Sequence, residues 1–292
     1  MTRKTDLAME ARELWEESAE DTTRLPGVRA RENRGRGITT TVVEILDQRG
    51  ARALRKPVGT YVTLEFQKGI LRDRAGFGRA AVRLGKVLAS MLPQTGPVLV
   101  AGLGNEAVTP DAIGPKTLDH LLVTRHLGGV LPGLRSVSAI APGVLGVTGL
   151  ESVEVVRGVV ERASPCCVVV VDALASREPG RLFRAVQLTD TGIIPGSGVR
   201  NSRAAFDRES LGVPVVAVGV PTVVDAATFA EDMKEETGNN PEKINHFQED
   251  NLVLTPRDVD ARIARIARLL GYGISLGLHS GLDLGDITCL LD

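Results

Sequence analysis

The chain has 292 residues, of which 43% are hydrophobic and 24% charged, and its formal net charge is −1. This length can bury a large core, and the near-neutral charge gives no general attraction to nucleic acid, so we expect no direct nucleic-acid binding. No apolar run reaches the ~18 residues of a membrane span, the opening MTRKTDLAME lacks the apolar centre of a signal peptide, and three cysteines make no disulfide framework.

The N-terminal third of the sequence predicts helices and a pair of strands. Apolar residues at helical spacing, separated by Glu and Arg, predict an amphipathic helix over Leu7–Ala19. A basic, glycine-containing stretch over Leu25–Gly37 predicts a loop. The next predicted elements are, in order, a strand over Ile38–Leu46, a turn at Gln48–Gly50, a strand over Gly59–Phe66 and a helix over Arg79–Leu92.

From Val98 onward, apolar runs alternate with helical patterns. The predicted elements are strand 98–101, helix 110–127, strand 135–140, helix 150–163, strand 166–171, strands 184–189 and 213–220, and a helix from Asp225. A polar loop over Glu235–Asp250 precedes a last helix that begins near Thr255 and Pro256. The alternation predicts a single α/β domain, residues 1–292, with a mostly parallel central sheet and helices on both faces.

Two aspartates form the candidate reactive centre of this sheet. The strand Val98–Ala101 leads through Gly102 and Gly104 to Asp111, and the strand 166–171 runs straight into Asp172. Open α/β sheets keep their chemistry at the carboxyl ends of the strands, so we expect both side chains at one edge. Each aspartate alone is typical of a helix N-terminus or cap. Two together favour a functional pair, either an acid and a base or the ligands of a divalent metal.

Two weaker patterns accompany this pair. Asp190 and Asp225 are further acids at predicted strand ends, and we rank them as supporting acids. The residues Gly102-x-Gly104-x-x-Ala107 match a loosened dinucleotide fingerprint. Pro110 places the helix start several residues beyond the glycines, away from the position of a pyrophosphate, which counts against a nucleotide site. A nucleotide-binding α/β protein nevertheless remains an alternative function.

Several long segments, all in order, resemble the spore germination endopeptidase family of endospore-forming bacteria. They are TDLAMEARE, VGTYVTLE, GLGNEAVTPDAIGP, LLVTRHL, SAIAPGVLGVTGLE, VVDALASR, QLTDTGIIPGSGV and LGVPVVAVGVPTVVDA. They extend from Thr5 to about Ala227, with a weaker return near LVLTPRDVD. The family carries a longer insertion where this chain has the short segment 231–254, so the role of that segment stays open.

The resemblance implies an endopeptidase that degrades small acid-soluble spore proteins in the spore core when germination begins. It implies an atypical aspartic-type protease that forms a homotetramer and uses Asp111 and Asp172 as catalytic residues. The family's fold is similar to that of the hydrogenase maturation proteases, a phosphorylase/hydrolase-like arrangement in which acids at the equivalent strand ends bind nickel. We therefore expect no cofactor, while a metal-dependent peptidase with a divalent ion at Asp111 and Asp172 stays an alternative.

The resemblance also implies a zymogen that processes itself near its N-terminus. Thr5-Asp6-Leu7-Ala8-Met9-Glu10 is similar to the motif at which the family cuts its substrates after an acidic residue. We therefore expect residues 1–6 to be a short propeptide that is removed by cleavage between Asp6 and Leu7. The alternative is that Thr5 and Asp6 only cap the first helix.

Overall fold

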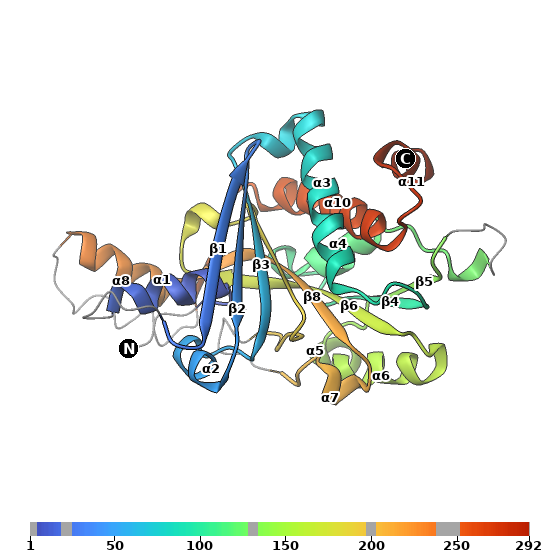
Figure 1. The fold of residues 1–292 in the computed structure, drawn as a ribbon, viewed down its shortest axis with the longest axis horizontal. Coiled ribbons are helices and arrows are strands. Elements are labelled where there is room, and N and C mark those ends of the chain that lie inside the picture. The colour runs from blue at the N-terminus through green and yellow to red at the C-terminus, as the bar shows by residue number, and fades with distance from the viewer. Residues whose placement is uncertain (1–4, 19–24, 128–133, 197–202, 238–251, 292) are drawn as a thin grey trace.

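A single mixed sheet with helices on both faces forms the body of the molecule (Figure 1). The computed structural model describes residues 5–18, 25–127, 134–196, 203–237 and 252–291. In this part of the chain nine strands join in the order β1-β2-β3-β7-β8-β6-β4-β5, and β9 pairs with β8. The strands are β1 (Val28–Gly35), β2 (Ile38–Ile45), β3 (Gly59–Phe66), β4 (Val98–Gly102), β5 (Val137–Ile140), β6 (Cys167–Ser176), β7 (Ala185–Thr189), β8 (Val215–Asp225) and β9 (Val253–Leu254).

The prediction of a mostly parallel sheet is wrong for the sheet as a whole. The neighbours β5, β4, β6 and β8 are mutually parallel, as the continuous apolar runs predict. The pairs β1/β2, β2/β3, β3/β7, β7/β8 and β8/β9 are antiparallel and outnumber the parallel pairs. The reason is that the chain adds an antiparallel meander to the β8 side, where strands need no crossover helix.

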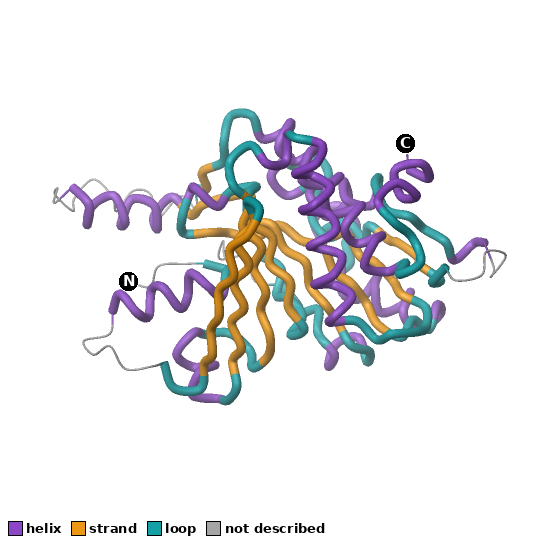
Figure 2. The backbone as a smooth tube through the Cα atoms, turned by 45° about the horizontal axis from the view of Figure 1, so that its top comes forward, coloured by secondary structure: helices purple, strands orange, loops and turns teal. Residues whose placement is uncertain are grey.

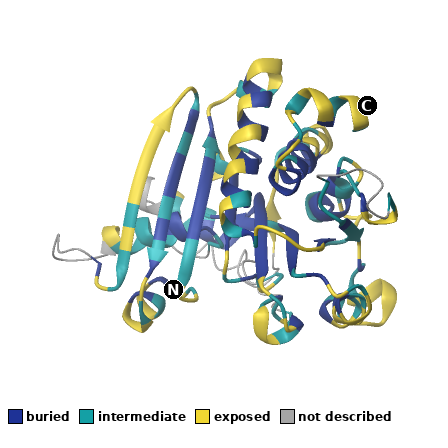
Figure 3. Ribbon diagram, turned by 45° about the vertical axis from the view of Figure 1, so that its right-hand side comes forward, coloured by how far each residue is buried: buried dark blue, intermediate teal, exposed yellow. Residues whose placement is uncertain are grey.

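The N-terminal part of the sheet contains a strand that the sequence pattern hides. The stretch predicted as a basic loop over Leu25–Gly37 holds β1, which is paired along its whole length with β2. β1 is the edge strand of the sheet and is mostly exposed, as Figure 3 shows. Its charged residues face solvent on both sides, so its sequence lacks the alternation of polar and apolar residues that is typical of a strand. The predicted turn at Gln48–Gly50 is also wrong, since Asp47 caps the helix α2 (Gln48–Leu54) through the N–H groups of Arg49 and Gly50.

The helices divide between the two faces of the sheet (Figures 1 and 2). In Figure 1, α3, α4 and α10 lie above the sheet, and α2, α5, α6 and α7 lie below it. The predicted helix over 110–127 is broken into a 3-10 turn at Thr109–Asp111, a short α4 and a second 3-10 turn at Arg125–Leu127. The helices are α1 (Ala8–Ser18), α3 (Arg74–Met91), α4 (Ile113–Leu118), α5 (Leu145–Thr148), α6 (Ser152–Ala163), α7 (Arg208–Leu211), α8 (Ala226–Thr237), α10 (Val259–Leu278) and α11 (Leu284–Leu291).

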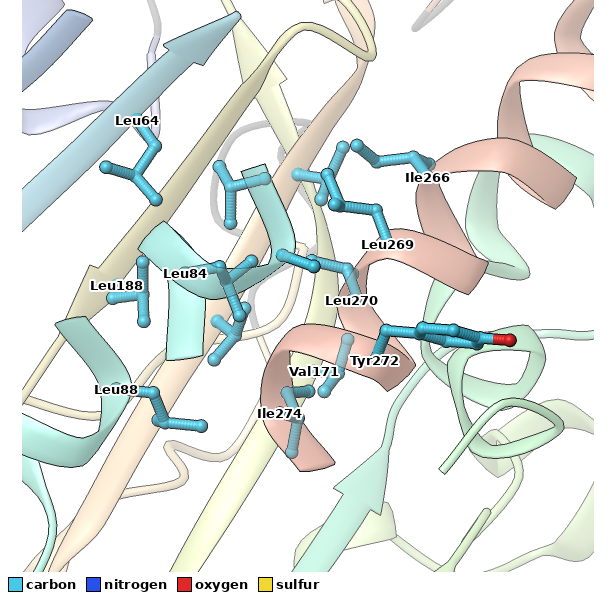
Figure 4. Close-up of a cluster of buried hydrophobic side chains, with 14 of the residues drawn as sticks. Leu64, Leu84, Leu88, Val171, Leu188, Ile266, Leu269, Leu270, Tyr272 and Ile274 are labelled. Carbon is cyan, nitrogen blue, oxygen red and sulfur yellow. The ribbon is translucent and has the colours of Figure 1, made fainter. Parts of the chain in front are cut away.

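The larger core lies between the sheet and the helix pair α3 and α10. Figure 4 shows Leu84 and Leu88 of α3 and Leu270 of α10 pointing toward strand residues that include Leu188. Small residues let the two helices approach closely, because a Cβ on Gly85 would lie 2.9 Å from the carbonyl oxygen of Gly273. This packing makes one face of the sheet an apolar, rigid support.

The opposite face of the sheet carries two smaller apolar clusters. One lies under α6 and includes Val168 and Val170 of β6. The other lies under α1 and α2 and includes Leu7 and Leu174. Asp172 belongs to this same face, since alternate residues of a strand share a face, and it lies along β6 between the two clusters. The fold therefore places the polar side chain of Asp172 between two apolar clusters on the same face of the sheet.

None of the described helices is long and apolar enough to cross a membrane. The polar loop predicted over Glu235–Asp250, and with it most of the shortened segment 231–254, lies largely outside the described residues.

Candidate functional site

Asp172 lies inside strand β6 and not at its end. β6 continues to Ser176, so the expectation that the strand ends at Val171 is wrong. The side chain is 4% exposed, and its Oδ1 accepts a hydrogen bond from the N–H of Ala173 at 2.9 Å. β4 ends beside Val171, where the N–H of Leu103 still donates to the Val171 carbonyl. Beyond that point the edge of β6 is open to another segment.

Asp111 reaches the same region from the loop that follows β4. Gly104 has φ +110°, and a Cβ there would lie 1.9 Å from the carbonyl oxygen of Asp111, so only glycine lets the loop fold this tightly. The N–H of Asn105 donates to Asp111 Oδ2 at 2.7 Å. The turn Thr109–Asp111 thus holds the carboxyl group toward the loop and β6.

Asp111 and Asp172 line one cavity of about 500 Å³. Burial raises the pKa of Asp172 well above its ordinary value, and the neighbouring Asp111 raises it further, while the Ala173 N–H opposes the shift. Burial also raises the pKa of Asp111, against the lowering effects of the Asn105 N–H and the nearby Arg203. The two carboxyls therefore titrate as an interacting pair that retains a proton more readily than free aspartate.

The two other acids singled out in the sequence lie apart from this pair. Asp190 is exposed and accepts the N–H of Thr60 at 2.8 Å, which ties the start of β3 to the end of β7. Asp225 is buried and accepts both the N–H and the hydroxyl of Thr228, each at 2.9 Å, at the start of α8. Neither side chain lines the cavity of the acid pair, and both make structural contacts.

Asp6, in the segment before α1, borders this cavity. Asp6 lines it together with Asp111 and Asp172, and its charge contributes to the raised pKa of Asp172. The N–H of Asp6 donates to the carbonyl of Ala175 at 2.9 Å, and the N–H of Ala175 donates to Asp6 Oδ2 at 2.8 Å. The segment therefore binds the open edge of β6 through the main chain, and the Asp6 carboxylate binds β6.

Two residues that the sequence reasoning missed hold the same segment. Gln187 of β7, 5% exposed, donates from Nε2 to the carbonyl of Asp6 at 3.1 Å and accepts the N–H of Ala8 on Oε1 at 2.7 Å. Lys56 donates from Nζ to the carbonyl of Thr5 at 3.4 Å. Burial lowers the pKa of the Lys56 ammonium, and the nearby Asp6 and Glu10 oppose this. No motif marks either residue, because only the fold brings them to the segment.

The structure bears on the two alternatives that the sequence leaves open, a nucleotide site and a metal site. The loop after Gly104 uses its N–H groups internally, since Asn105 binds Asp111 and Ala107 binds the Asn105 side chain, so they do not point to a phosphate. Among the described residues no group of three or more His, Cys, Asp or Glu side chains is arranged around a metal position. Asp111 and Asp172 would thus be short of protein ligands for a divalent ion, and we derive no step through one.

The family model and the sequence relatives agree on one family. A family model described as germination protease matches residues 8–236. The germination protease of Caldanaerobacter subterraneus subsp. tengcongensis is 43% identical over 99% of this chain and 98% of its own. Those of Clostridium acetobutylicum and Bacillus cytotoxicus are 39% and 36% identical, covering 98% and 96% of this chain and 98% and 94% of their own. A solved NiFe hydrogenase maturation protease, HycI from Thermococcus kodakarensis KOD1, is similar with 17% identity and a TM-score of 0.36, covering 64% of this chain and 98% of its own.

Proposed function

This chain belongs to the germination protease family, and from that premise we propose that Asp111 and Asp172 are its catalytic residues. The observation that carries the proposal is that both carboxyls line one cavity with a peptide segment of the chain itself. A protease needs a base for the attacking water and an acid for the leaving amine. Two carboxyls of unequal proton affinity supply both, which makes this an atypical aspartic-type endopeptidase.

The environments of the two carboxyls support different roles for them. Asp172 is the more deeply buried and its pKa is raised well above the ordinary value, so it holds the proton and acts as the acid. Asp111 accepts the Asn105 N–H and lies near Arg203, which favour its ionised form, so it acts as the base. Asp111 takes a proton from water, whose oxygen attacks the carbonyl carbon of the peptide. Asp172 gives its proton to the amide nitrogen as the C–N bond breaks.

The first substrate in this proposal is the bond between Asp6 and Leu7. Asp6 is bound along β6 in the cavity of the pair, and α1 begins at Ala8, just beyond the bond. The carboxylate of Asp6 binds the Ala175 N–H and does not cap α1. The hydroxyl of Thr5 accepts the N–H of Leu7 at 3.0 Å and donates to Glu10 of α1, so the capping alternative applies to Thr5. Cleavage removes residues 1–6 as a short propeptide and opens the edge of β6 for other peptides.

We further propose that these other peptides are small acid-soluble spore proteins in the spore core, and that the enzyme works as a homotetramer. Both follow from the resemblance described above. A sedimentation experiment on the purified chain measures the assembly, and a single species of monomer mass would contradict it. Incubation with a purified small acid-soluble spore protein measures the substrate, and an intact substrate after long incubation would contradict it.

Replacement of each carboxyl tests the catalytic pair. Asp111→Asn and Asp172→Asn keep the side-chain shape and each should lower the turnover of a peptide with the sequence of residues 2–12 by at least ~100-fold, the low end of general acid–base catalysis. Asp190→Asn, at an acid outside the cavity, is the matched control and should keep turnover. Near-normal turnover in either Asp111→Asn or Asp172→Asn would contradict the proposal.

A further inference from the structure

The side-chain amide of Gln187 spans the peptide bond between Asp6 and Leu7. Its Nε2 donates to the carbonyl oxygen of Asp6 at 3.1 Å, on one side of that bond. Its Oε1 accepts the N–H of Ala8 at 2.7 Å, on the other side. An amide has one accepting and one donating end, so the bond from Ala8 fixes which end meets the Asp6 carbonyl. Gln187 is also buried, in a part of β7 whose neighbours are β3 and β8.

The sheet register places this amide two strands from Asp172. Gln187 lines a neighbouring cavity of about 200 Å³, which shares Asp6 and Leu174 with the cavity of the acid pair. Gln187 is paired with Gly219 of β8, and Gly219 is paired with Asp172 of β6. Residues in register on adjacent strands project to the same face of a sheet, so Gln187 and Asp172 rise from the same face with a glycine between them. Asp6 lies in the cavity of Asp172 and is held by Gln187. The peptide segment is therefore in reach of an acid on one strand and an amide donor on another.

We propose that Gln187 binds the carbonyl oxygen of the peptide bond that is cleaved and stabilises the negative charge that this oxygen acquires. The inference rests on the proposed function, because it takes the Asp6–Leu7 bond as a substrate of the acid pair. When water adds to the carbonyl carbon, the C=O electron pair moves onto the oxygen, and the Nε2–H of Gln187 already points at that atom. The charge leaves the oxygen again when the carbonyl re-forms and the C–N bond breaks.

A neutral donor suits this position. Asp111, the ionised member of the pair, brings negative charge into the cavity, and without a donor the oxyanion would form near like charge. An amide donates without titrating, so its contribution does not depend on the protonation of the pair. After residues 1–6 leave, both ends of the Gln187 amide become available to the corresponding carbonyl and N–H of another peptide. The same residue then serves substrates that bind in trans.

The competing role for Gln187 is purely structural, since it also receives the first N–H of α1. A structural role predicts lower stability and unaltered chemistry in the folded enzyme. Gln187→Glu separates the two roles where the new carboxyl is ionised, because it then keeps an acceptor for the Ala8 N–H and lacks the donor to the carbonyl. Gln187→Met removes both contacts and stays neutral, so it controls for the added charge of Gln187→Glu.

The experiment measures kcat and KM of the full chain on the peptide of residues 2–12. We expect both Gln187 variants to lower kcat by ~100–1000-fold, as loss of one oxyanion donor does, with KM close to the wild-type value because the interaction strengthens in the transition state. Gln67→Glu and Gln67→Met make the same changes at an exposed glutamine and should keep both constants. Thermal unfolding shows whether each variant is folded. The concentration of folded enzyme is then measured, and kcat is calculated per folded molecule.

The outcomes separate this inference from the catalytic pair. Wild-type kcat in folded Gln187→Glu would overturn the role of Gln187, as would a rise in KM with kcat unchanged. If Asp172→Asn is inactive while Gln187→Glu is fully active, this inference alone fails. If Gln187→Glu is inactive while Asp172→Asn cleaves normally, the acid pair fails, and with it the proposal that Gln187 serves that pair.

Discussion

Arg181 holds the first helix, and its replacement has a predictable effect. Its side chain is 12% exposed and binds Glu10 at 3.0 Å, Glu13 at 2.8 Å and Glu65 at 3.1 Å. Glu10 is fully buried and also accepts the N–H groups of Arg177 and Glu178. These contacts join α1 to β3 and to the turn after β6, close to the segment that enters the cavity.

Arg181→Met removes the guanidinium that forms the ion pair with Glu10 and leaves the glutamate buried. Loss of one partner of a buried pair destabilises a protein by ~3–5 kcal/mol because the other charge stays desolvated. We expect a loss of this size in the free energy of unfolding, measured by urea denaturation followed by circular dichroism. The double variant Arg181→Met with Glu10→Gln should recover part of it. The charge is then removed, but the amide accepts only one of the two N–H groups that both oxygens of Glu10 bind.

Arg12→Met is the matched control for this prediction. Arg12 is bound to Glu16 one turn away on the same helix, with side chains 33% and 47% exposed. An exposed pair of this kind contributes ~0.3–0.5 kcal/mol. A loss below ~1 kcal/mol for Arg181→Met, within the range of exposed pairs, would refute the reasoning. It would mean that α1 is held by its apolar face alone.

Three further predictions concern the acid pair and the residues that hold the N-terminal segment. Burial raises the pKa of Asp172 in the folded chain, so its stabilising contribution is complete below the ordinary value of 3.8 and is lost as the pH rises through the raised value. Asp172→Asn should therefore unfold at a higher temperature than wild type at neutral pH and at the same temperature in strong acid; equal unfolding temperatures at neutral pH would contradict this. Lys56→Met should raise KM for the peptide of residues 2–12 by ~10-fold, because a hydrogen bond from a charged group is worth ~1.5–3 kcal/mol, and an unchanged KM would remove Lys56 from substrate binding. Chelation should leave activity intact, whereas a loss restored by one divalent ion would favour the metal-dependent alternative.

The parallel half of the sheet could be predicted from the sequence because its strands are buried on both faces. The runs Val98–Ala101 and Cys166–Val171 are continuously apolar, and such strands predict parallel neighbours. The antiparallel half could not be predicted in the same way. β1 is an exposed edge strand rich in arginine, and the direction of β7 depends on its pairing with β3 and β8, which no local pattern encodes.

The candidate site, like the sheet, could be predicted from the sequence only in part. Asp111 and Asp172 follow apolar runs, and the edge rule for α/β sheets predicts that they lie together, although β6 continues past Asp172 to Ser176. Asp190 and Asp225 follow the same rule in sequence, yet their carboxyls are taken by Thr60 and Thr228. Gln187 carries no signal in its short strand, since its role depends on a register that extends across β7, β8 and β6.

The time course of N-terminal processing tests the central claim most directly. Intact-mass spectrometry follows the purified full chain under mildly acidic conditions, which favour retention of a proton by the pair because both pKa values are raised. The account predicts a product that begins at Leu7, formed at least ~100-fold more slowly in Asp111→Asn and in Asp172→Asn. A chain that keeps residues 1–6 while it cleaves added peptide at full rate, or an Asp172→Asn chain that processes itself normally, would contradict it.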